Sequence, residues 1–325
     1  MSLNSSFYLS QFPHGLMFHR FHKQESFPVG QGSITPGEFE KILHFVGIDN
    51  ILSPEEWLFK LKNNSLKGND LCITFDDGLR CQYDICLPIL EKYNLKVFWF
   101  IYSSVFEGKI NKFEIYSYFG TRYFSNIDEF FELFFSRCEK STLNQINEHK
   151  FKKYLQEASK CFSFYSPNDL KFRFIRDELL SKEKFENIMD KIMEEKGVFI
   201  AEIVENLWLS NLELRALSEN GHCIGLHSYS HPFQLSKLSY EEQLNQYLKN
   251  YNHINKICNK EIISMSHPLN SYNESTLRVL SDLGILCGFR SNMAPPNGKK
   301  INPSCLEMAR EDAVNILKTI ANTKL

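Results

Sequence analysis

The sequence lacks a strong excess of charge of either sign. Its 325 residues include 37 Lys and Arg against 39 Asp and Glu, which gives a formal net charge of −2. A protein that binds nucleic acid or an anionic membrane surface needs a basic field, so we expect no nucleic-acid partner. The most apolar stretch, residues 97–106, contains two serines and is too short to cross a bilayer, so we expect no transmembrane segment.

Signals for export are also missing. The N-terminus shows no basic segment followed by an apolar core, which is the pattern of a secretory signal. The nine cysteines are an odd number, and no two of them have Cys-x-x-Cys spacing. Several lie in apolar segments, as Cys72 and Cys223 do, which is typical of small buried side chains in a reducing compartment. We therefore expect a cytoplasmic protein.

No repeat and no linker rich in Gly, Ser or Pro divides the chain. Instead, short apolar runs alternate with capped helical patterns, which indicates a parallel α/β fold. The runs that we interpret as strands are residues 16–21, 71–75, 97–102, 222–226, 262–266 and 285–289. Capping sequences at Thr35, Ser53, Ser210 and Ser239 predict the starts of helices. About seven such strand–helix units predict a single barrel or near-barrel domain over residues 1–325.

The pattern changes between about residues 111 and 196. Segments such as residues 130–135 and 181–196 have apolar residues at helical spacing among many charges, and no strand pattern lies between them. We therefore predict a helical insertion in the barrel. Two interpretations stay open. The insertion is a lid or a partner surface, through which the chain would form a homo-oligomer, or it consists of extra helices packed outside the sheet.

Titratable side chains follow several of the predicted strands. Those at or just beyond a predicted carboxyl end are Asp76, Asp77, His227, His231, His267 and His19. Because chemistry in such folds collects at the carboxyl ends of the strands, we expect these groups to form one site. His227 and His231 are four residues apart, a spacing that places both on one face of either a helix or a strand. One carboxylate and two imidazoles suit a catalytic metal, and the second carboxylate is free to act as a base.

At these motifs the sequence resembles a known family. Thr74-Phe-Asp-Asp-Gly78 is similar to the first signature of the polysaccharide deacetylases, which form carbohydrate esterase family 4. His227-Ser-Tyr-Ser-His231 is similar to their second signature, His-Ser/Thr-x-x-His. The segment after Ile263 resembles their third signature in part. The resemblance covers about residues 7–106 and 198–306 and leaves out the predicted insertion.

The resemblance implies an α/β fold of the distorted (β/α)7 barrel type (TIM-like). It also implies one divalent metal held by Asp77, His227 and His231, with Asp76 as the base that deprotonates the attacking water. A backbone N–H near Leu269 would help to hold the oxyanion of the reaction. Zn²⁺ is the metal that we expect first, and Fe²⁺, Co²⁺ and Ni²⁺ suit the same ligands.

Departures from the family pattern concern the groups around the base. The Arg that orients the base in many members would fall at Ser266 here, so another cation must take its place. Arg290 and Arg310 are the candidates. The aromatic residue expected at Leu269 is missing, so the wall of the sugar pocket differs.

The family's late Leu-x-x-His signature has no counterpart, because no His follows His267. The acid that protonates the leaving amine must therefore come from elsewhere. His267 is our choice, and His19 and His22 are the alternatives. Tyr229 and Tyr272 are candidates to line the substrate site.

The sequence as a whole predicts a metal-dependent hydrolase that removes an acetyl group from an N-acetylated sugar of a glycan or glycan precursor. Two alternatives stay open. One is a C–N hydrolase of a small cyclic amide on the same barrel. The other is a catalytically degenerate barrel that binds a glycan or a partner.

Overall fold

The computed structural model describes residues 11–23, 27, 29–30, 32–161, 165–298 and 300–323. The chain divides into two compact units. The first unit comprises Met1–Lys23, Ser33–Ile110 and Trp208–Leu325, and it contains every strand of the sheet described below. The second unit comprises Gln24–Gly32 and Asn111–Leu207. The predicted helical insertion, residues 111–196, lies within the second unit.

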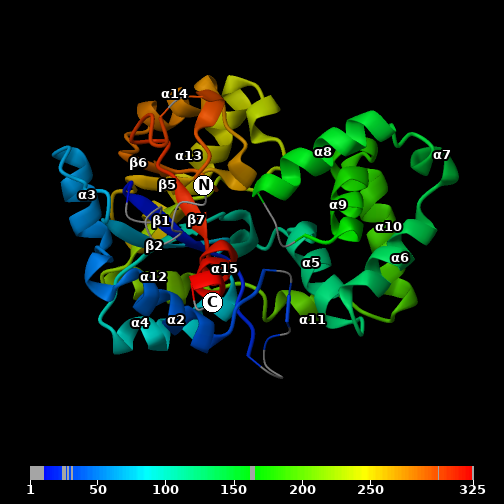
Figure 1. The fold of residues 1–325 in the computed structure, drawn as a ribbon, viewed down its shortest axis with the longest axis horizontal. Helices are drawn as coiled ribbons and strands as arrows, with labels where there is room; N and C mark the ends of the chain where they lie inside the picture. Colours follow the sequence, from blue (N-terminus) through cyan, green and yellow to red (C-terminus); the bar gives the residue numbers. More distant parts are fainter. Residues whose placement is uncertain are drawn as a thin grey trace. The chain divides into compact units, whose positions relative to one another are not determined.

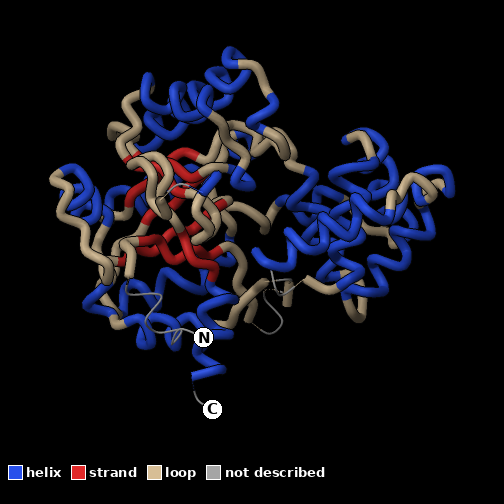
Figure 2. The backbone as a smooth tube through the Cα atoms, turned by 45° about the horizontal axis from the view of Figure 1, so that its top comes forward, coloured by secondary structure: helices blue, strands red, loops and turns tan. Residues whose placement is uncertain are grey.

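The first unit is built on a seven-stranded parallel sheet whose strands follow the order β6-β5-β4-β3-β2-β1-β7. The strands are β1 (His14–Phe18), β2 (Leu71–Asp76), β3 (Phe98–Ile101), β4 (Cys223–Leu226), β5 (Ser264–Ser266), β6 (Cys287–Phe289) and β7 (Arg310–Asp312). A parallel bridge between Phe289 and Met308 joins the end of β6 to the residues just before β7. The sheet is therefore a nearly closed barrel, with strands gathered inside surrounding helices (Figure 2), and the predicted (β/α)7 barrel is confirmed.

Two of the differences from the predicted strands bear on the site. The first strand ends at Phe18, whereas the apolar pattern predicted that it would continue to residue 21. β7 was not predicted, because its three residues, Arg310 to Asp312, are all charged and give no apolar signal. β7 pairs with β1 along residues 310–312 and completes the sheet. The Arg310 side chain is nevertheless fully buried, which shows that this short strand places it in the barrel interior.

Helices of the first unit begin where the capping sequences predicted. Capping boxes form at Thr35, Ser53, Ser210 and Ser239, in which the side chain and a Glu three residues later satisfy two free backbone N–H groups. The α-helices are α2 (Pro36–Val46), α3 (Pro54–Lys62), α4 (Leu87–Lys92), α12 (Asn211–Glu219), α13 (Tyr240–Cys258), α14 (Glu274–Asp282) and α15 (Ala313–Thr323). Shorter turns are η1 (Ile48–Asn50), η3 (Ser104–Glu107), η5 (Leu235–Lys237), η6 (Pro268–Asn270) and η7 (Pro296–Gly298), and η2 (Gln82–Cys86) is a π-helical turn.

The barrel interior explains where the site lies. Alternate residues of a strand share one face, and Cys72 of β2 belongs to the buried core cluster with Phe98, Phe100 and Phe289. Asp76 lies four residues beyond Cys72, on the same face and at the carboxyl end of β2. The apolar interior therefore gives way to a carboxylate at the end of the strand where catalytic groups collect in such barrels.

The long segment of the second unit, Asn111–Leu207, is built from helices joined by short loops in its described residues, and it is the green part of the chain in Figure 1. Its helices are α5 (Lys112–Arg122), α6 (Ile127–Arg137), α7 (Lys140–Leu143), α8 (Glu148–Cys161), α9 (Pro167–Phe174), η4 (Ile175–Leu179), α10 (Lys182–Glu195) and α11 (Ile200–Val204). Phenylalanine rings of α6, α9 and α10 form its core. The ring centre of Phe134 lies 4.8 Å from that of Phe172 and 5.9 Å from that of Phe185. Among the described residues of the whole chain, no helix is both long and apolar enough to span a membrane.

Candidate active site

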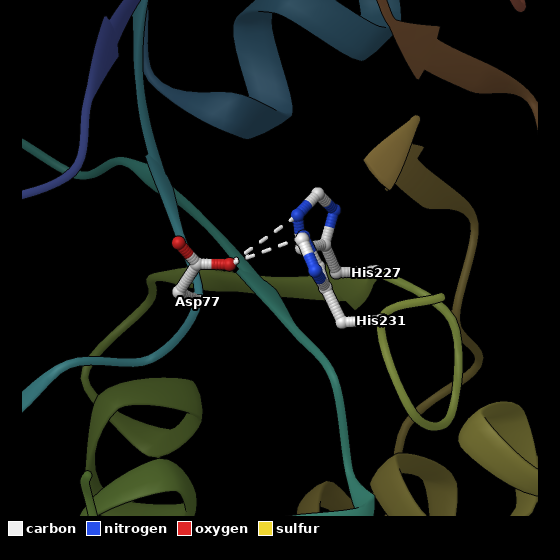
Figure 3. A group of neighbouring side chains, drawn as sticks. All are labelled: Asp77, His227 and His231. Carbon is white, nitrogen blue, oxygen red and sulfur yellow. Dashed lines mark ion pairs between the residues drawn. The ribbon is translucent and has the colours of Figure 1, made fainter. Parts of the chain in front are cut away.

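Three side chains converge at the carboxyl ends of two strands. Asp77 follows β2, His227 follows β4, and His231 lies on the loop after β4 (Figure 3). The Asp77 Oδ1 atom is 3.5 Å from His227 Nε2 and 3.6 Å from His231 Nε2. One ligand atom from each residue lies within 4.8 Å of the others. The three side chains are at most 7% exposed, so the predicted ligands share one buried pocket of polar atoms.

Unusual backbone conformations bring these side chains together. β2 ends at Asp76, and Asp77 and Gly78 both have positive φ, at 76° and 63°. Positive φ is costly for a residue with a side chain, and it turns the chain so that neighbouring carboxylates no longer point to opposite faces. On the second loop, Ser228 and His231 also have positive φ. Such strain is typical of functional sites, where the surrounding structure holds it in place.

Hydrogen bonds fix the orientation of His227. Its Nδ1 atom lies 2.9 Å from the Ser266 carbonyl oxygen and 2.7 Å from the Ser266 hydroxyl. The carbonyl can only accept, so Nδ1 carries the proton when the ring is neutral, and Nε2 turns a lone pair toward Asp77. The His227 backbone N–H donates to Asn250 Oδ1, and the Asn250 amide donates to the Ile101 carbonyl. Asn250 thereby connects α13 to the carboxyl ends of β3 and β4.

The loop between His227 and His231 is held by contacts with residues 104–107 of the same unit. The Tyr229 hydroxyl donates to Glu107 Oε2 at 2.7 Å, and the Tyr229 carbonyl accepts from the Ser104 backbone N–H. Tyr229 is 7% exposed. In this arrangement it fastens the loop between His227 and His231, whereas the sequence suggested it as a candidate to line the substrate site.

The residues fit a divalent metal. Asp77 Oδ1 is buried and has no hydrogen-bond partner, although an unpaired buried carboxylate oxygen is costly. Imidazole nitrogens of His227 and His231 lie 3.5 and 3.6 Å from this oxygen, and the near nitrogen of His227 carries no proton when its ring is neutral. A cation bound between one carboxylate and two neutral imidazoles satisfies all three atoms, and Zn²⁺ sites are built from these groups.

The charges of the three residues depend on each other. Burial alone would raise the pKa of Asp77, but the neighbouring His227 and His231 imidazoles outweigh burial and lower it. Burial alone would lower the pKa of His227, but the Asp76 and Asp77 carboxylates outweigh burial and raise it. For His231 burial prevails over Asp77 and lowers the pKa to about 4, so this ring is neutral and able to ligate near pH 7.

Asp76 lies in a different environment. Arg310 of β7 donates two hydrogen bonds to it, from Nη1 to Oδ1 and from Nη2 to Oδ2, both at 2.7 Å. The Ser266 hydroxyl also donates to Oδ1. Burial would raise the pKa of Asp76, but the Arg310 guanidinium, followed by His227, outweighs it and lowers the pKa to about 2. Of the two predicted candidates for the missing Arg, Arg310 is the one in contact with Asp76.

The candidate acids occupy three different places. His19 follows β1, and its Nε2 atom is 3.6 Å from Asp76 Oδ2 while its side chain is 34% exposed. His22 lies farther along and contacts the Ser33 hydroxyl through Nδ1. His267 is fully buried, its Nε2 donates to the Leu306 carbonyl, and burial lowers its pKa to about 3. The structure thus brings His19, and not the preferred His267, to the carboxylate and to solvent.

The remaining predicted site residues are also dispersed. Tyr272 stacks on His267, with ring centres 4.2 Å apart, and donates to Glu307. Arg290 is buried and donates to the carbonyl groups of Glu307, Ala294 and Ile301. Leu269 lies on η6 beyond β5, is 47% exposed and has a positive φ of 49°. The Leu269 backbone N–H thus stays a candidate for holding the oxyanion. Arg290 makes its described hydrogen bonds with backbone oxygens and Asn292, and none of them is with Asp76.

Comparisons with known proteins agree with the fold and the motifs. The model of the polysaccharide deacetylase family matches residues 187–288, which include the second motif and the segment after β5. A search of curated proteins found no relative similar in sequence.

Solved structures give the same result for the fold. A deacetylase of Streptococcus pyogenes, PplD, in complex with acetate is 17% identical, with a TM-score of 0.53 over 95% of this chain and 97% of the other. IcaB from Ammonifex degensii is 13% identical, with a TM-score of 0.52 over 92% and 91% of the two chains. A de-N-acetylase from Aggregatibacter actinomycetemcomitans is 14% identical, with a TM-score of 0.52 over 95% and 98%.

Proposed function

We propose that this chain is a polysaccharide deacetylase and that it removes an acetyl group from an N-acetylated sugar of a glycan or glycan precursor. The observation that carries the proposal is the pair of neighbouring carboxylates: Asp77 faces two imidazoles with an unpartnered oxygen, and Asp76 is held as an anion beside them. A divalent metal held by Asp77, His227 and His231 would polarise the acetamide carbonyl and the attacking water. Zn²⁺ is our first choice, and Fe²⁺, Co²⁺ and Ni²⁺ fit the same ligand set.

Asp76 acts as the base in this proposal. Its Oδ2 atom lies 4.0 Å from His227 Nε2, so the carboxylate is next to the three ligand residues without being one of them. Because Arg310 keeps it ionised, Asp76 is ready to accept the proton of the attacking water near neutral pH. The guanidinium also holds the carboxylate in one orientation through two parallel hydrogen bonds.

His19 is the residue we propose as the acid. Its Nε2 atom is close to Asp76 and its side chain reaches solvent, so it can meet a substrate that enters from the barrel mouth. From this position it would donate a proton to the departing amine, which leaves a free amino sugar and acetate. A backbone N–H near Leu269 would assist the oxyanion, as the family resemblance implies.

The compartment and the assembly are part of the proposal. The eight cysteines whose side chains are described are free thiols, and this supports a reducing compartment such as the cytoplasm. A homo-oligomer through the helical second unit stays a prediction.

The decisive experiment combines metal analysis with product analysis. Purified protein is loaded with Zn²⁺, freed of excess metal and analysed for metal by mass spectrometry, and acetate release is measured on a panel of N-acetylated sugars and oligosaccharides. We expect one metal per chain and acetate release that stops on chelation and returns with metal. The same protein is offered small cyclic amides, with ring opening as the readout. Metal binding with ring opening but no acetate would contradict the proposal in favour of a cyclic amide hydrolase.

A further inference from the structure

One buried glutamine links the two strands that carry the proposed acid and base. Gln82 is the first residue of η2, and its side chain is fully buried. Its Nε2 atom donates to the His19 carbonyl oxygen at 2.7 Å and to the Asp76 carbonyl oxygen at 2.6 Å. Both hydrogens of the amide nitrogen are therefore donated. One goes to the residue that follows β1, and the other goes to the last residue of β2.

The orientation of this amide follows from its partners. Carbonyl oxygens only accept hydrogen bonds, so the nitrogen of the Gln82 amide must face them and the oxygen must point away. Gln82 Oε1 has no hydrogen-bond partner among the described atoms. The contribution of the side chain is therefore its pair of N–H donors, at the cost of a buried oxygen that is left unsatisfied.

The amide acts where strand pairing stops. The pairing of β1 with β2 runs from His14↔Leu71 to Phe18↔Phe75. His19 and Asp76 are the next residue on each strand, one step beyond the last pair. Gln82 joins their carbonyl groups at this step, and their side chains form the contact of 3.6 Å between His19 Nε2 and Asp76 Oδ2.

The local helix geometry suits this role. η2 is a π-helical turn, and such turns are frequent at functional sites because they displace a side chain from its place in a regular helix. The Gln82 backbone N–H donates to the Leu79 carbonyl, which ties the start of η2 to the turn that follows Asp77 and Gly78. The same short loop therefore carries a metal ligand, turns the chain and returns the Gln82 amide to the strand ends.

We propose that Gln82 is a positioning residue that sets the separation of His19 and Asp76, and thereby the geometry of proton transfer in the reaction. The inference rests on the proposed function for its catalytic part. Its structural part, the joining of the two strand ends, stands without it.

The test replaces Gln82 by Met, which has a similar length but no N–H donor. Gln243→Met is the matched control, because Gln243 is also fully buried and its amide donates to the Leu238 carbonyl and accepts from Thr276, away from the site. We expect Gln82→Met to lower kcat by about 10–100-fold with little change in KM, because small misplacements of catalytic groups have effects of this size. Zn²⁺ content should stay at the wild-type level. Gln243→Met should keep wild-type kcat even where it lowers Tm as much.

A crystal structure of Gln82→Met provides the second readout. We expect the distance between His19 Nε2 and Asp76 Oδ2 to exceed that of the wild type by roughly 1 Å. If Gln82→Met does not fold, Gln82→Asn replaces it, since its shorter side chain cannot reach both carbonyl groups. Equal kcat in the Gln82 and Gln243 variants, or an unchanged distance, would overturn the inference. Absence of acetate release from the wild type would refute the proposed function instead, and the crystallographic distance would still decide the role of Gln82.

Discussion

Asp76 and Asp77 are neighbours in sequence with the same carboxylate group, yet the barrel treats them differently. Both Asp76 oxygens accept hydrogen bonds from Arg310, and Ser266 donates a further one. Asp77 Oδ1 has no hydrogen-bond partner and faces two imidazole nitrogens. One carboxylate is therefore satisfied by protein donors, and the other is left with an oxygen that only a cation or a proton can satisfy.

The difference teaches that the environment, and not the residue type, divides the work between two carboxylates. An anion held by Arg310 is poorly suited to give its oxygens to a metal, because they are already engaged. An anion beside two imidazoles, which ligate metals in their neutral form, is well suited to it. Each of the following predictions changes one side of this comparison and measures whether the other side responds.

Replacing Asp76 by Asn should have the largest effect on turnover. The amide keeps the shape of the side chain but cannot accept a proton, and base catalysis is worth about 10²–10⁴-fold. We expect kcat for acetate release to fall by at least that factor while Zn²⁺ content stays unchanged. The matched variant Asp77→Asn should instead lose Zn²⁺ binding, measured by elemental analysis. If the two variants had the same metal content, the division of work between the two carboxylates would be refuted.

Replacing Arg310 by Met should cost the most stability. The change leaves the Asp76 charge buried without a partner, and breaking a buried ion pair in this way typically costs about 3–5 kcal/mol of unfolding free energy. The measurement is chemical denaturation of the protein at pH 7. In an Asp76→Asn background the same Arg310→Met change should cost clearly less, because no charge is left unpaired. Equal costs in both backgrounds would show that Arg310 acts by packing and not through Asp76.

Arg310 also marks the limit of what the sequence predicts. The proposed metal ligands lie in two short motifs, so the two motifs together with the family resemblance named Asp77, His227 and His231 as candidates. The partner of Asp76 is 234 residues away in the chain and lies on a strand of three charged residues, for which periodicity gives no signal. The sequence therefore named Arg310 only as one of two candidates.

The sequence also contained no sign that His267, the residue predicted to be the acid, has a buried side chain. His267 has suitable chemistry and lies next to a strand end, but nothing in the sequence shows that its ring packs against Tyr272 and donates to Leu306. The barrel itself was predictable, because six of its strands have apolar runs and four of its helices begin at the capping sequences that were predicted. Contacts between distant side chains, such as those of Gln82 and Asn250, depend on the folded geometry and carry no local signal.

His222 provides a contrast to His227 at the opposite end of the same strand. It precedes β4, is 4% exposed, and burial followed by the nearby Lys96 lowers its pKa from 6.5 to about 4. The unfolded chain therefore binds more protons between pH 6.5 and about 4, so stability is complete above pH 6.5 and decreases as the pH falls through this window. The shift corresponds to a loss of about 3 kcal/mol in unfolding free energy at the lower end. Denaturation at pH 7 and pH 4.5 should show a smaller decrease for His222→Gln than for the wild type, and an equal decrease would show that His222 is protonated in the folded state.

Asn250 tests whether a residue that orients a proposed metal ligand affects the affinity for Zn²⁺. Its amide accepts from the His227 backbone and donates to the Ile101 carbonyl, so these hydrogen bonds join it to the backbone and not to a ligand side chain. Because groups that orient metal ligands typically change metal affinity by about 10–100-fold, Asn250→Leu should weaken Zn²⁺ binding by that factor, measured by competition with a chromophoric chelator. Asn255→Leu is the matched control, since Asn255 lies on the same helix and its amide donates to the Lys260 carbonyl. If both variants bound Zn²⁺ as tightly as the wild type, the position of His227 would be set by β4 alone, and the difference between the two carboxylates would depend only on the residues that contact them.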